Sequence, residues 1–365
     1  MILHRYFAWR FLMIFSATFL VFIVFMALLD VVEQARRFGD TDASFRDFIG
    51  LSLLNLPQSI YVILPLILIL STIGLFLGLA RSSEMVVTRA AGRSAMRALV
   101  APVFVTLLIG AFGVAIMNPM VATTSKQFEV RVNELTNTGG NVMSITASGL
   151  WLRQGSASGQ TVIRAANANA EGTQLRDVTF ITFGAEGGPT RRIEAAGAAL
   201  ADGAWTLTDA KVWPLADDRN PEEWAVTYPS LDIPSSLTAD QIRDSFGTPS
   251  TVPIWELPAF IHNLQQAGFS ARRHLVWFHM ELALPAFLVS MVLIGAGFTM
   301  RHPRGGRTGL MVLYAIILSF GLFFIRNLAQ VLGESGQIPV ILAAWAPPLA
   351  AIGLSLGLLL HLEDG

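Results

Sequence analysis

The chain has 365 residues, of which 53% are hydrophobic and only 14% charged, with a mean hydropathy of +0.55 and a formal net charge of −1. This composition excludes most enzyme classes and indicates a membrane protein. The chain contains no cysteine, which excludes disulfides, thiolate metal sites and cysteine nucleophiles.

Six apolar stretches are each long enough to cross a bilayer as a helix, which takes roughly 20 predominantly apolar residues. Three of them precede a long polar insert and three follow it. They lie at 11–29, 59–80, 98–125, 282–300, 309–332 and 337–362. The sequence therefore predicts a polytopic membrane protein and makes transport or export the first function to test.

Arginines in the short loops predict the orientation of these spans, because such residues are enriched on the cytoplasmic side. One side carries Arg5, Arg10, Arg81, Arg89, Arg93, Arg97, Arg301, Arg304 and Arg307. The opposite side carries only Arg36, Arg37, Arg46 and the marginal Arg326. We therefore expect both chain termini to be cytoplasmic and the insert to lie outside.

The insert contains short segments with alternating or β-branched residues, which are typical of β-strands. They lie at 142–152, 161–165, 178–183 and 205–212. Strands at this spacing favour a sandwich or a jelly roll, and helical spacing returns at 255–266. The predicted fold is a membrane α-helical protein with six spans (3+3) and an inserted all-β, jelly-roll-like domain. The predicted domains are spans one to three at 1–125, the β-domain at 126–254, a connecting helix at 255–276 and spans four to six at 277–365.

Motifs for catalysis and for nucleotide binding are missing from the sequence. It has no G-x-x-x-x-G-K-[ST] loop, so we do not expect ATP to bind this chain by that route. His274 and His279, with Glu281 nearby, have poor spacing for a metal site on one helix face. We predict no catalytic residue, no metal and no cofactor.

The loop after the second span predicts a short helix at about 83–91. Ser82 or Ser83 can cap its start, Glu84 suits its positive N-terminal end, and Gly92 is a plausible stop. The prominent side chains on this helix would be Met85, Val86 and Val87. Two interpretations remain open, a helix that couples to a partner protein and an ordinary positively charged loop.

The stretch RSSEMVVTRAAG at 81–92 resembles the R-S-E-[LM]-x-V-[MT]-x-[AS]-x-G block of the lipopolysaccharide-export permeases. Similar matches occur in the start MILHRY, in DVVEQARRFG at 30–39, in two Leu-Pro steps and in GLW at 149–151. Of the two paralogous subunits of that transporter, the chain looks more like the G-type. The resemblance implies a periplasmic jelly roll between two groups of three spans, in the inner membrane of a Gram-negative bacterium.

The same resemblance implies a transport subunit of an ABC transporter that extracts lipopolysaccharide and passes it to a periplasmic bridge. A separate dimeric ATPase would bind ATP and dock on the short helix through Glu84, Met85, Val86, Arg89 and Gly92. The other implied partners are a paralogous permease subunit, a single-span jelly-roll protein, a periplasmic bridge protein and lipopolysaccharide, with no nucleic acid. Spans one and five would line a lateral gate.

Three arginines lie near the outer ends of the implied gate helices. Arg36, Arg37 and Arg326 can bind lipopolysaccharide phosphates through a bidentate fork, and the alternative is that they only anchor the helices at the interface. Members of the family can carry a basic residue at the position of Asp30. Because an acid cannot hold a phosphate, we expect headgroup contacts at Arg36 and Arg37, and an ion pair between Asp30 and one of the arginines.

Two other functions remain open on the sequence. The first is a mechanotransmitting or lipoprotein-exporting ABC permease, although such permeases typically have four spans. The second is a membrane-anchored sensor or scaffold whose β-domain binds a ligand. A scaffold predicts no ATPase partner and no requirement for Glu84.

Overall fold

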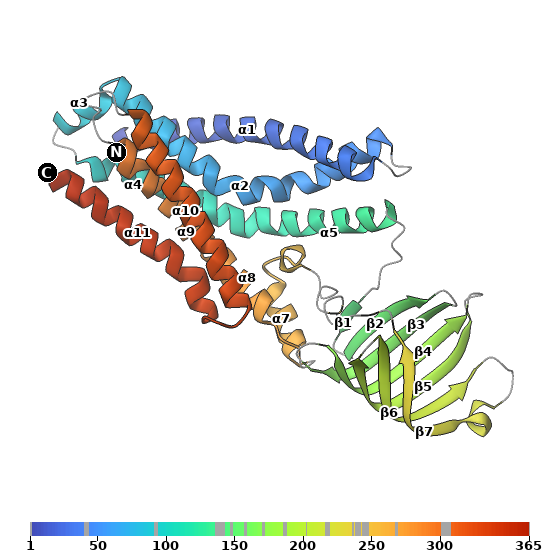
Figure 1. The fold of residues 1–365 in the computed structure, drawn as a ribbon. Helices are drawn as coiled ribbons and strands as arrows, with labels where there is room; N and C mark the ends of the chain where they lie inside the picture. Colours follow the sequence, from blue (N-terminus) through green and yellow to red (C-terminus); the bar gives the residue numbers. More distant parts are fainter. Residues whose placement is uncertain are drawn as a thin grey trace. The chain divides into compact units, whose positions relative to one another are not determined.

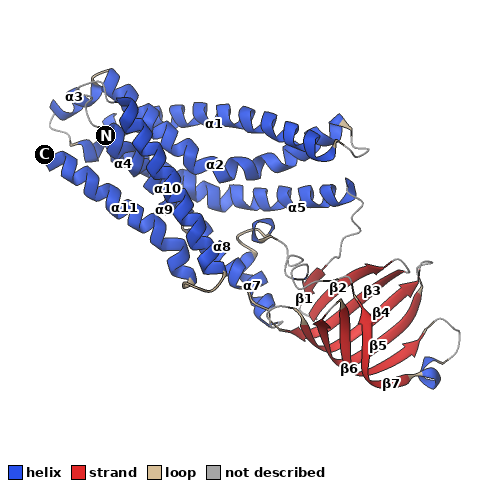
Figure 2. Cartoon of the chain, in the orientation of Figure 1, coloured by secondary structure: helices blue, strands red, loops and turns tan. Residues whose placement is uncertain are grey.

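A computed structural model of the chain describes residues 2–39, 44–90, 94–135, 143–146, 149–156, 159–169, 172–184, 188–201, 203–215, 220–235, 237, 242, 248–266, 269–300 and 308–364. The chain divides into two compact units. A helical unit contains residues 1–132, 250–255 and 272–365, and a β-unit contains 133–249 and 256–271. Helices dominate the first unit and strands the second (Figure 2).

The helical unit consists mainly of long apolar helices, joined in part by short turns (Figure 1). They are α1 (Ile2–Phe38), α2 (Phe45–Arg81), α3 (Glu84–Ala90), α4 (Ala95–Phe112), a π-helical turn (Gly113–Met117), α5 (Asn118–Leu135), α8 (Arg272–Leu282), α9 (Leu284–Thr299), α10 (Thr308–Glu334) and α11 (Val340–Asp364). α1 begins, α11 ends and α3 lies at the same end of this unit (Figure 1). Five helices in the described chain are long and apolar enough to span a membrane, or six if the bent pair α8–α9 is one span. This agrees with the six predicted spans.

α9 is the central helix of the unit. It is apolar on all sides and almost entirely buried, and its main neighbours are α2, α4, α10 and α11. α8 and α9 meet at an angle of 50°, next to Pro285, which has no backbone N–H to continue the helix of α8. A Cβ atom on Gly110 of α4 would lie 2.7 Å from Cα of Pro285, so only glycine allows this close approach.

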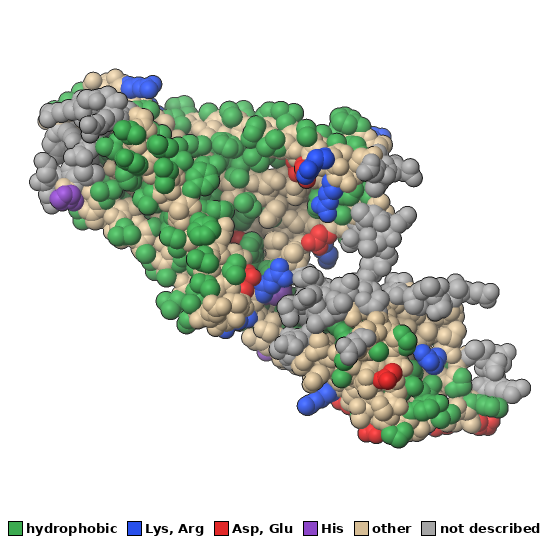
Figure 3. Space-filling view, viewed as in Figure 1, with side chains coloured by type: hydrophobic (Ala, Val, Ile, Leu, Met, Phe, Trp, Pro, Cys, Tyr) green, Lys and Arg blue, Asp and Glu red, His purple; other side chains and the backbone are tan. Residues whose placement is uncertain are grey.

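Helices α1 and α2 are longer than the bilayer core. α1 and α2 each have 37 residues, which corresponds to roughly 55 Å of helix, against about 30 Å of hydrocarbon. Both helices therefore extend beyond the spans 11–29 and 59–80 that the sequence predicts. Hydrophobic side chains cover most of the helical unit on the face seen in Figure 3, as expected for a surface in contact with lipid or with other membrane helices.

The β-unit is one antiparallel sheet of seven described strands in which every strand pairs with its neighbours in the chain (Figure 1). The strands are β1 (Met143–Thr146), β2 (Gly149–Ser156), β3 (Gly159–Ala168), β4 (Gln174–Gly184), β5 (Pro189–Ala201), β6 (Ala204–Pro214) and β7 (Val226–Pro234). Inward side chains such as Phe180 and Trp205 are fully buried and their rings meet edge to face at 6.4 Å.

The inserted β-domain is confirmed, and its topology is a meander. Short connections place each described strand beside the preceding one, whereas a jelly roll needs long crossings between strands. The segment 142–152, which we predicted as one strand, contains two strands that pair with each other, with Ser144 opposite Trp151. The helix expected at 255–266 is α7 (Leu257–Gln266), which buries Leu257, Ile261 and Leu264 on one face.

Candidate functional site

The short helix α3 begins after a sharp turn at the end of α2. Ser83 adopts a positive φ of 58°, which ends the α2 geometry. The carbonyl of Ser83 then accepts hydrogen bonds from the backbone N–H groups of Val86 and Val87, at 3.1 and 3.2 Å, and starts the new helix. A helix thus lies within the range 83–91 that the sequence predicts, while its coupling role stays a prediction.

The carboxylate of Glu84, the first residue of α3, accepts hydrogen bonds from three side chains. The hydroxyl of Tyr6 donates to Oε2 over 2.8 Å, and the guanidinium of Arg10 donates to Oε1 over 2.6 Å. The hydroxyl of Ser82 also donates to Oε1, over 2.7 Å. We refer to Tyr6, Arg10, Ser82 and Glu84 as the Glu84 cluster, which joins α1, the end of α2 and α3.

Helical periodicity explains why α1 supplies two of these donors. Tyr6 and Arg10 are four residues apart and therefore share one face of α1, and Arg10 also donates to the Tyr6 hydroxyl over 2.5 Å. Phe7 is buried beside them in the core of the unit. Gly78 of α2 lies beside the guanidinium, and a Cβ atom there would be in ordinary van der Waals contact with Nη2 of Arg10, at 3.8 Å.

The pKa of the Glu84 carboxyl is shifted by opposing effects. Partial burial raises the pKa, while the hydrogen bonds from Arg10, Ser82 and Tyr6 and the charge of Arg10 lower it. The net result is a pKa below the ordinary value of 4.5. Glu84 is therefore ionised at neutral pH and its charge is balanced by Arg10.

The other predicted coupling residues differ in their surroundings. Met85 is buried in the hydrophobic core of the helical unit. Val86 and Val87 are exposed, at 49% and 68%, and form the outward apolar surface of α3. The side chain of Arg89 and all of Gly92 lie outside the described residues.

Arg36 and Arg37 lie in the last turn of α1 and are exposed. Arg36 forms an ion pair with Glu33 at 2.9 Å, whereas the guanidinium of Arg37 lies over the ring of Phe38 at 5.3 Å. Asp30 forms no ion pair with an arginine among the described residues, in contrast to our expectation. Its Oδ1 accepts hydrogen bonds from Asn55 of α2 over 2.8 Å and from Gln34 over 3.5 Å.

A second carboxylate lies within the membrane helices. Glu281, near the end of α8, is only 1% exposed and accepts a hydrogen bond from the hydroxyl of Tyr61 on α2. Asn118, the first residue of α5, lies near this carboxylate, and its Oδ1 accepts the backbone N–H of Ile254 over 2.9 Å. Buried ionisable groups in membrane helices are costly unless partnered, so this cluster fixes α2, α5 and α8 relative to one another.

Arg326 of α10 completes this second cluster, which we call the Glu281 cluster. Its guanidinium lies 4.9 Å from the centre of the Phe287 ring and interacts electrostatically with Glu281 and Tyr61. No carboxylate of the described residues is close enough for a direct ion pair with it. Arg326 is therefore attracted electrostatically by Glu281, and its guanidinium N–H groups remain available to another acceptor. Arg272, a further arginine before α9, instead donates to the carbonyls of Gly333 and Ile338.

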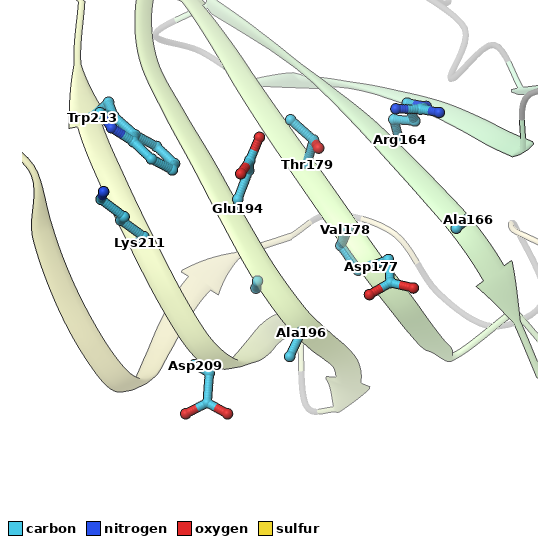
Figure 4. A pocket seen from close by; sticks show the side chains of 11 residues that line it. Arg164, Ala166, Asp177, Val178, Thr179, Glu194, Ala196, Asp209, Lys211 and Trp213 are labelled. Atoms are coloured by element: carbon cyan, nitrogen blue, oxygen red, sulfur yellow. The ribbon is translucent and has the colours of Figure 1, made fainter. Parts of the chain in front are cut away.

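The β-unit has a shallow open pocket of about 570 Å³ on its sheet (Figure 4). Charged side chains of both signs project into it from β3 to β6. They include Arg164, Glu194 and Lys211, with Trp213 beside them (Figure 4). Lys211 and Trp213 of β6 both donate hydrogen bonds to Glu222, which lies in the short 3-10 helix at Pro221–Trp224, so part of this polar surface is paired internally. This mixed surface selects no class of ligand, and the Glu84 cluster is the stronger candidate site.

Sequence reasoning found Glu84 and missed its partners. In the sequence, Arg10 is only one of the positive charges that predict the orientation of the helices. Tyr6 is only part of the segment MILHRY that resembles the family. Their spacing of four residues was the available signal, but nothing in the sequence places α1 beside α3. Tyr61 and Asn118 were missed for the same reason, because each lies inside an apolar helix far from Glu281 in the chain.

The fold and these two clusters define a class, namely polytopic membrane proteins with an antiparallel β-domain inserted between two groups of membrane helices. The family model described as lipopolysaccharide export system permease LptF/LptG matches residues 5–361, and the chain belongs to this family. The lipopolysaccharide export system permease protein LptG of Haemophilus influenzae is 24% identical over 374 residues, covering 99% of both chains. The family that the block at 81–92 suggested is thus confirmed.

Proposed function

We propose that this chain is the G-type permease subunit of an ABC transporter that extracts lipopolysaccharide from the inner membrane. A separate dimeric ATPase binds and hydrolyses ATP, a paralogous permease completes the membrane part, and a single-span jelly-roll protein and a bridge protein receive the lipid. The full-length match to the export permeases carries this proposal. The chain itself holds no cofactor and performs no covalent step.

The geometry of α3 supports docking of an ATPase. The helix combines an outward apolar surface, Val86 and Val87, with a fixed acidic residue at its start. It lies at the end of the helical unit where α1 begins and α11 ends (Figure 1). The positive loops on this side support a cytoplasmic location for both termini and a periplasmic β-domain.

The two gate helices are suited to a lipid cargo. The apolar window of α1 has no buried residues and that of α10 has only 17%, which leaves large apolar surfaces for acyl chains or for the paralogous subunit. Arg37 at the end of α1 and Arg326 on α10 have unused N–H donors within the described part of the chain. We therefore assign them, with Arg36, to the phosphates of the headgroup.

The proposed mechanism is mechanical. Closure of the ATPase pair on ATP moves α3, the membrane helices narrow the cavity, and the lipid leaves toward the β-domains. Each step uses contacts between surfaces, so the chain requires a rigid α3 and mobile gate helices. The hydrogen bonds of Glu84 to Tyr6, Arg10 and Ser82 support a rigid α3, and the unburied apolar window of α1 supports a gate helix that faces lipid.

Variants of the exposed surface of α3 test the proposal. Val86→Asp should abolish co-purification of the ATPase, because it places a charge on an apolar contact without touching the Glu84 cluster. Val226→Asp is a matched control, since Val226 lies on β7 and is also 49% exposed. Mass spectrometry of the purified wild-type complex should find lipopolysaccharide, a similar six-span subunit and an ABC ATPase.

Other outcomes of this experiment would contradict the proposal. An ATPase with lipoprotein, or without a lipid cargo, would favour a lipoprotein-exporting or mechanotransmitting permease. Isolation of the chain alone, with ordinary phospholipid, would favour a membrane-anchored sensor or scaffold. Equal ATPase binding by Val86→Asp and Val226→Asp would remove α3 as the docking surface.

A further inference from the structure

The donors to Glu84 come mainly from α1, a helix at the surface of the helical unit. α1 packs chiefly on α2 and α4, and its apolar window has no buried residue. At its start, however, Tyr6 and Arg10 both contact the first residue of α3. The side chains of Arg10 and Glu84 are only 24% and 34% exposed, so water weakens this contact less than an ordinary surface ion pair.

We propose that Tyr6 and Arg10 are positioning residues that fix the carboxylate of Glu84 and transmit the movement of α3 to α1. This inference rests on the proposed function, in which α3 receives the force of the ATPase and α1 forms one side of the gate. It adds a direct connection between the two, formed by three side chains of this chain. Glu84 then transmits movement to α1 within the chain, and this role does not depend on the contact that Glu84 makes with the ATPase.

The chemistry of the contact suits transmission of a small movement. Arg10 supplies a charge-assisted hydrogen bond to one oxygen of Glu84, and Tyr6 supplies a neutral donor to the other. Two donors on two oxygens fix the direction of the carboxylate as well as its distance. Hydrogen bonds to a charged group are stronger than those between neutral groups, so the two bonds favour a joint movement of the ends of α1 and α3.

The same helix provides a matched control. Arg5 lies about one turn before Arg10 and is exposed, and it has no hydrogen bond or ion pair with another described residue. Replacing Arg5 or Arg10 by Ala removes the same charge from the same end of α1. Only the second substitution removes a donor to Glu84, so any difference between the two reports the contact.

The experiment uses the complete complex of chain, paralogue and ATPase in proteoliposomes that contain lipopolysaccharide. For Arg10→Ala, Tyr6→Phe, Arg10→Lys and Arg5→Ala, three quantities are measured: ATPase bound, ATP hydrolysed, and lipopolysaccharide released to a soluble acceptor. We expect Arg10→Ala to bind the ATPase normally and to release roughly tenfold less lipid per ATP. Tyr6→Phe should show a smaller loss, Arg10→Lys should recover part of it, and Arg5→Ala should match the wild type.

The outcomes separate the two proposals. If the wild-type complex hydrolyses ATP without releasing lipopolysaccharide, the proposed function fails. If it releases lipid, and Tyr6→Phe and Arg10→Ala release as much per ATP as wild type, the inference is wrong. An equal loss in Arg5→Ala and Arg10→Ala would also contradict it, because total charge would then be the cause. Should Arg10→Ala fail to fold, Tyr6→Phe decides, since it deletes a single hydroxyl.

Discussion

The Glu84 cluster and the Glu281 cluster have similar members and opposite surroundings. In each, a carboxylate accepts a tyrosine hydroxyl and lies near an arginine. Glu84 is half-buried at a helix start and bonds directly to Arg10 at 2.6 Å. Glu281 is fully buried between membrane helices, and Arg326 lies near it without a direct ion pair.

This difference indicates two roles, one contact that transmits movement between helices and one that stabilises their packing. A partly exposed ion pair gains little net free energy and can break and re-form as helices move. A buried carboxylate that loses its donors is left without compensation, which costs several kcal/mol. The Glu84 cluster is therefore suited to transmit movement between α1 and α3, and the Glu281 cluster to hold α2, α5 and α8 in place.

The largest predicted effect is on stability at the buried cluster. Glu281→Ala should lower the free energy of unfolding by about 3 kcal/mol, because the Tyr61 hydroxyl loses its acceptor and the buried Arg326 loses its nearby opposite charge. Glu84→Ala should cost only about 1 kcal/mol at its partly exposed position. The measurement is loss of helical circular dichroism on heating, or on titration with denaturant, for the purified chain in one detergent.

Glu281→Gln is the control for this comparison. The amide keeps an acceptor for the Tyr61 hydroxyl, so this variant should lose less stability than Glu281→Ala. An equal loss of stability in Glu84→Ala and Glu281→Ala would contradict this difference in role between the two clusters.

An effect of intermediate size is expected on lipopolysaccharide binding by the arginines at the outer end of α1. These two arginines also differ in whether a carboxylate pairs with them. Arg36 is already paired with Glu33, whereas Arg37 only covers the ring of Phe38. Arg37→Ala should therefore weaken lipopolysaccharide binding more than Arg36→Ala, by about fivefold against less than about twofold. Crosslinking or fluorescence binding of lipopolysaccharide to the complex measures this, and the reverse order would show that Glu33 does not restrain Arg36.

The smallest effect is the pH dependence of the Glu84 cluster. The pKa of Glu84 is lower in the folded chain than its usual 4.5. Its contribution to stability is therefore fully present above about pH 4.5 and is lost as the pH falls through the folded pKa. The difference in melting temperature between wild type and Glu84→Gln should stay constant from pH 8 to pH 5 and shrink below that. A difference that grows on acidification would mean that the carboxyl is not held as a carboxylate.

Much of the fold could be predicted because apolar length and strand alternation are local signals. The span at 98–125 is helical throughout and the span at 337–362 is α11 from Val340 on, while the strands at 161–165 and 178–183 fall within β3 and β4. These signals could not predict the order of the strands, because an alternating pattern does not show which strands pair with each other. The meander therefore differs from the jelly roll that strand spacing favoured.

The site could be predicted only in part, because its contacts join distant residues. A local motif identified Glu84 and α3. The partner Tyr6 lies 78 residues away and Tyr61 lies 220 residues from Glu281, and such pairings arise only when the helices pack. Asp30 shows the same limit, since its neutral partner Asn55 is on another helix and the nearby arginines in sequence point elsewhere.

The most direct test of the account is lipopolysaccharide release by the reconstituted complex of this chain, its paralogue and the ATPase, with and without ATP. The account predicts release to a soluble acceptor only with ATP, and loss of that release in the Val86→Asp variant that no longer binds the ATPase. ATP hydrolysis by the intact complex with no release of lipopolysaccharide would contradict it.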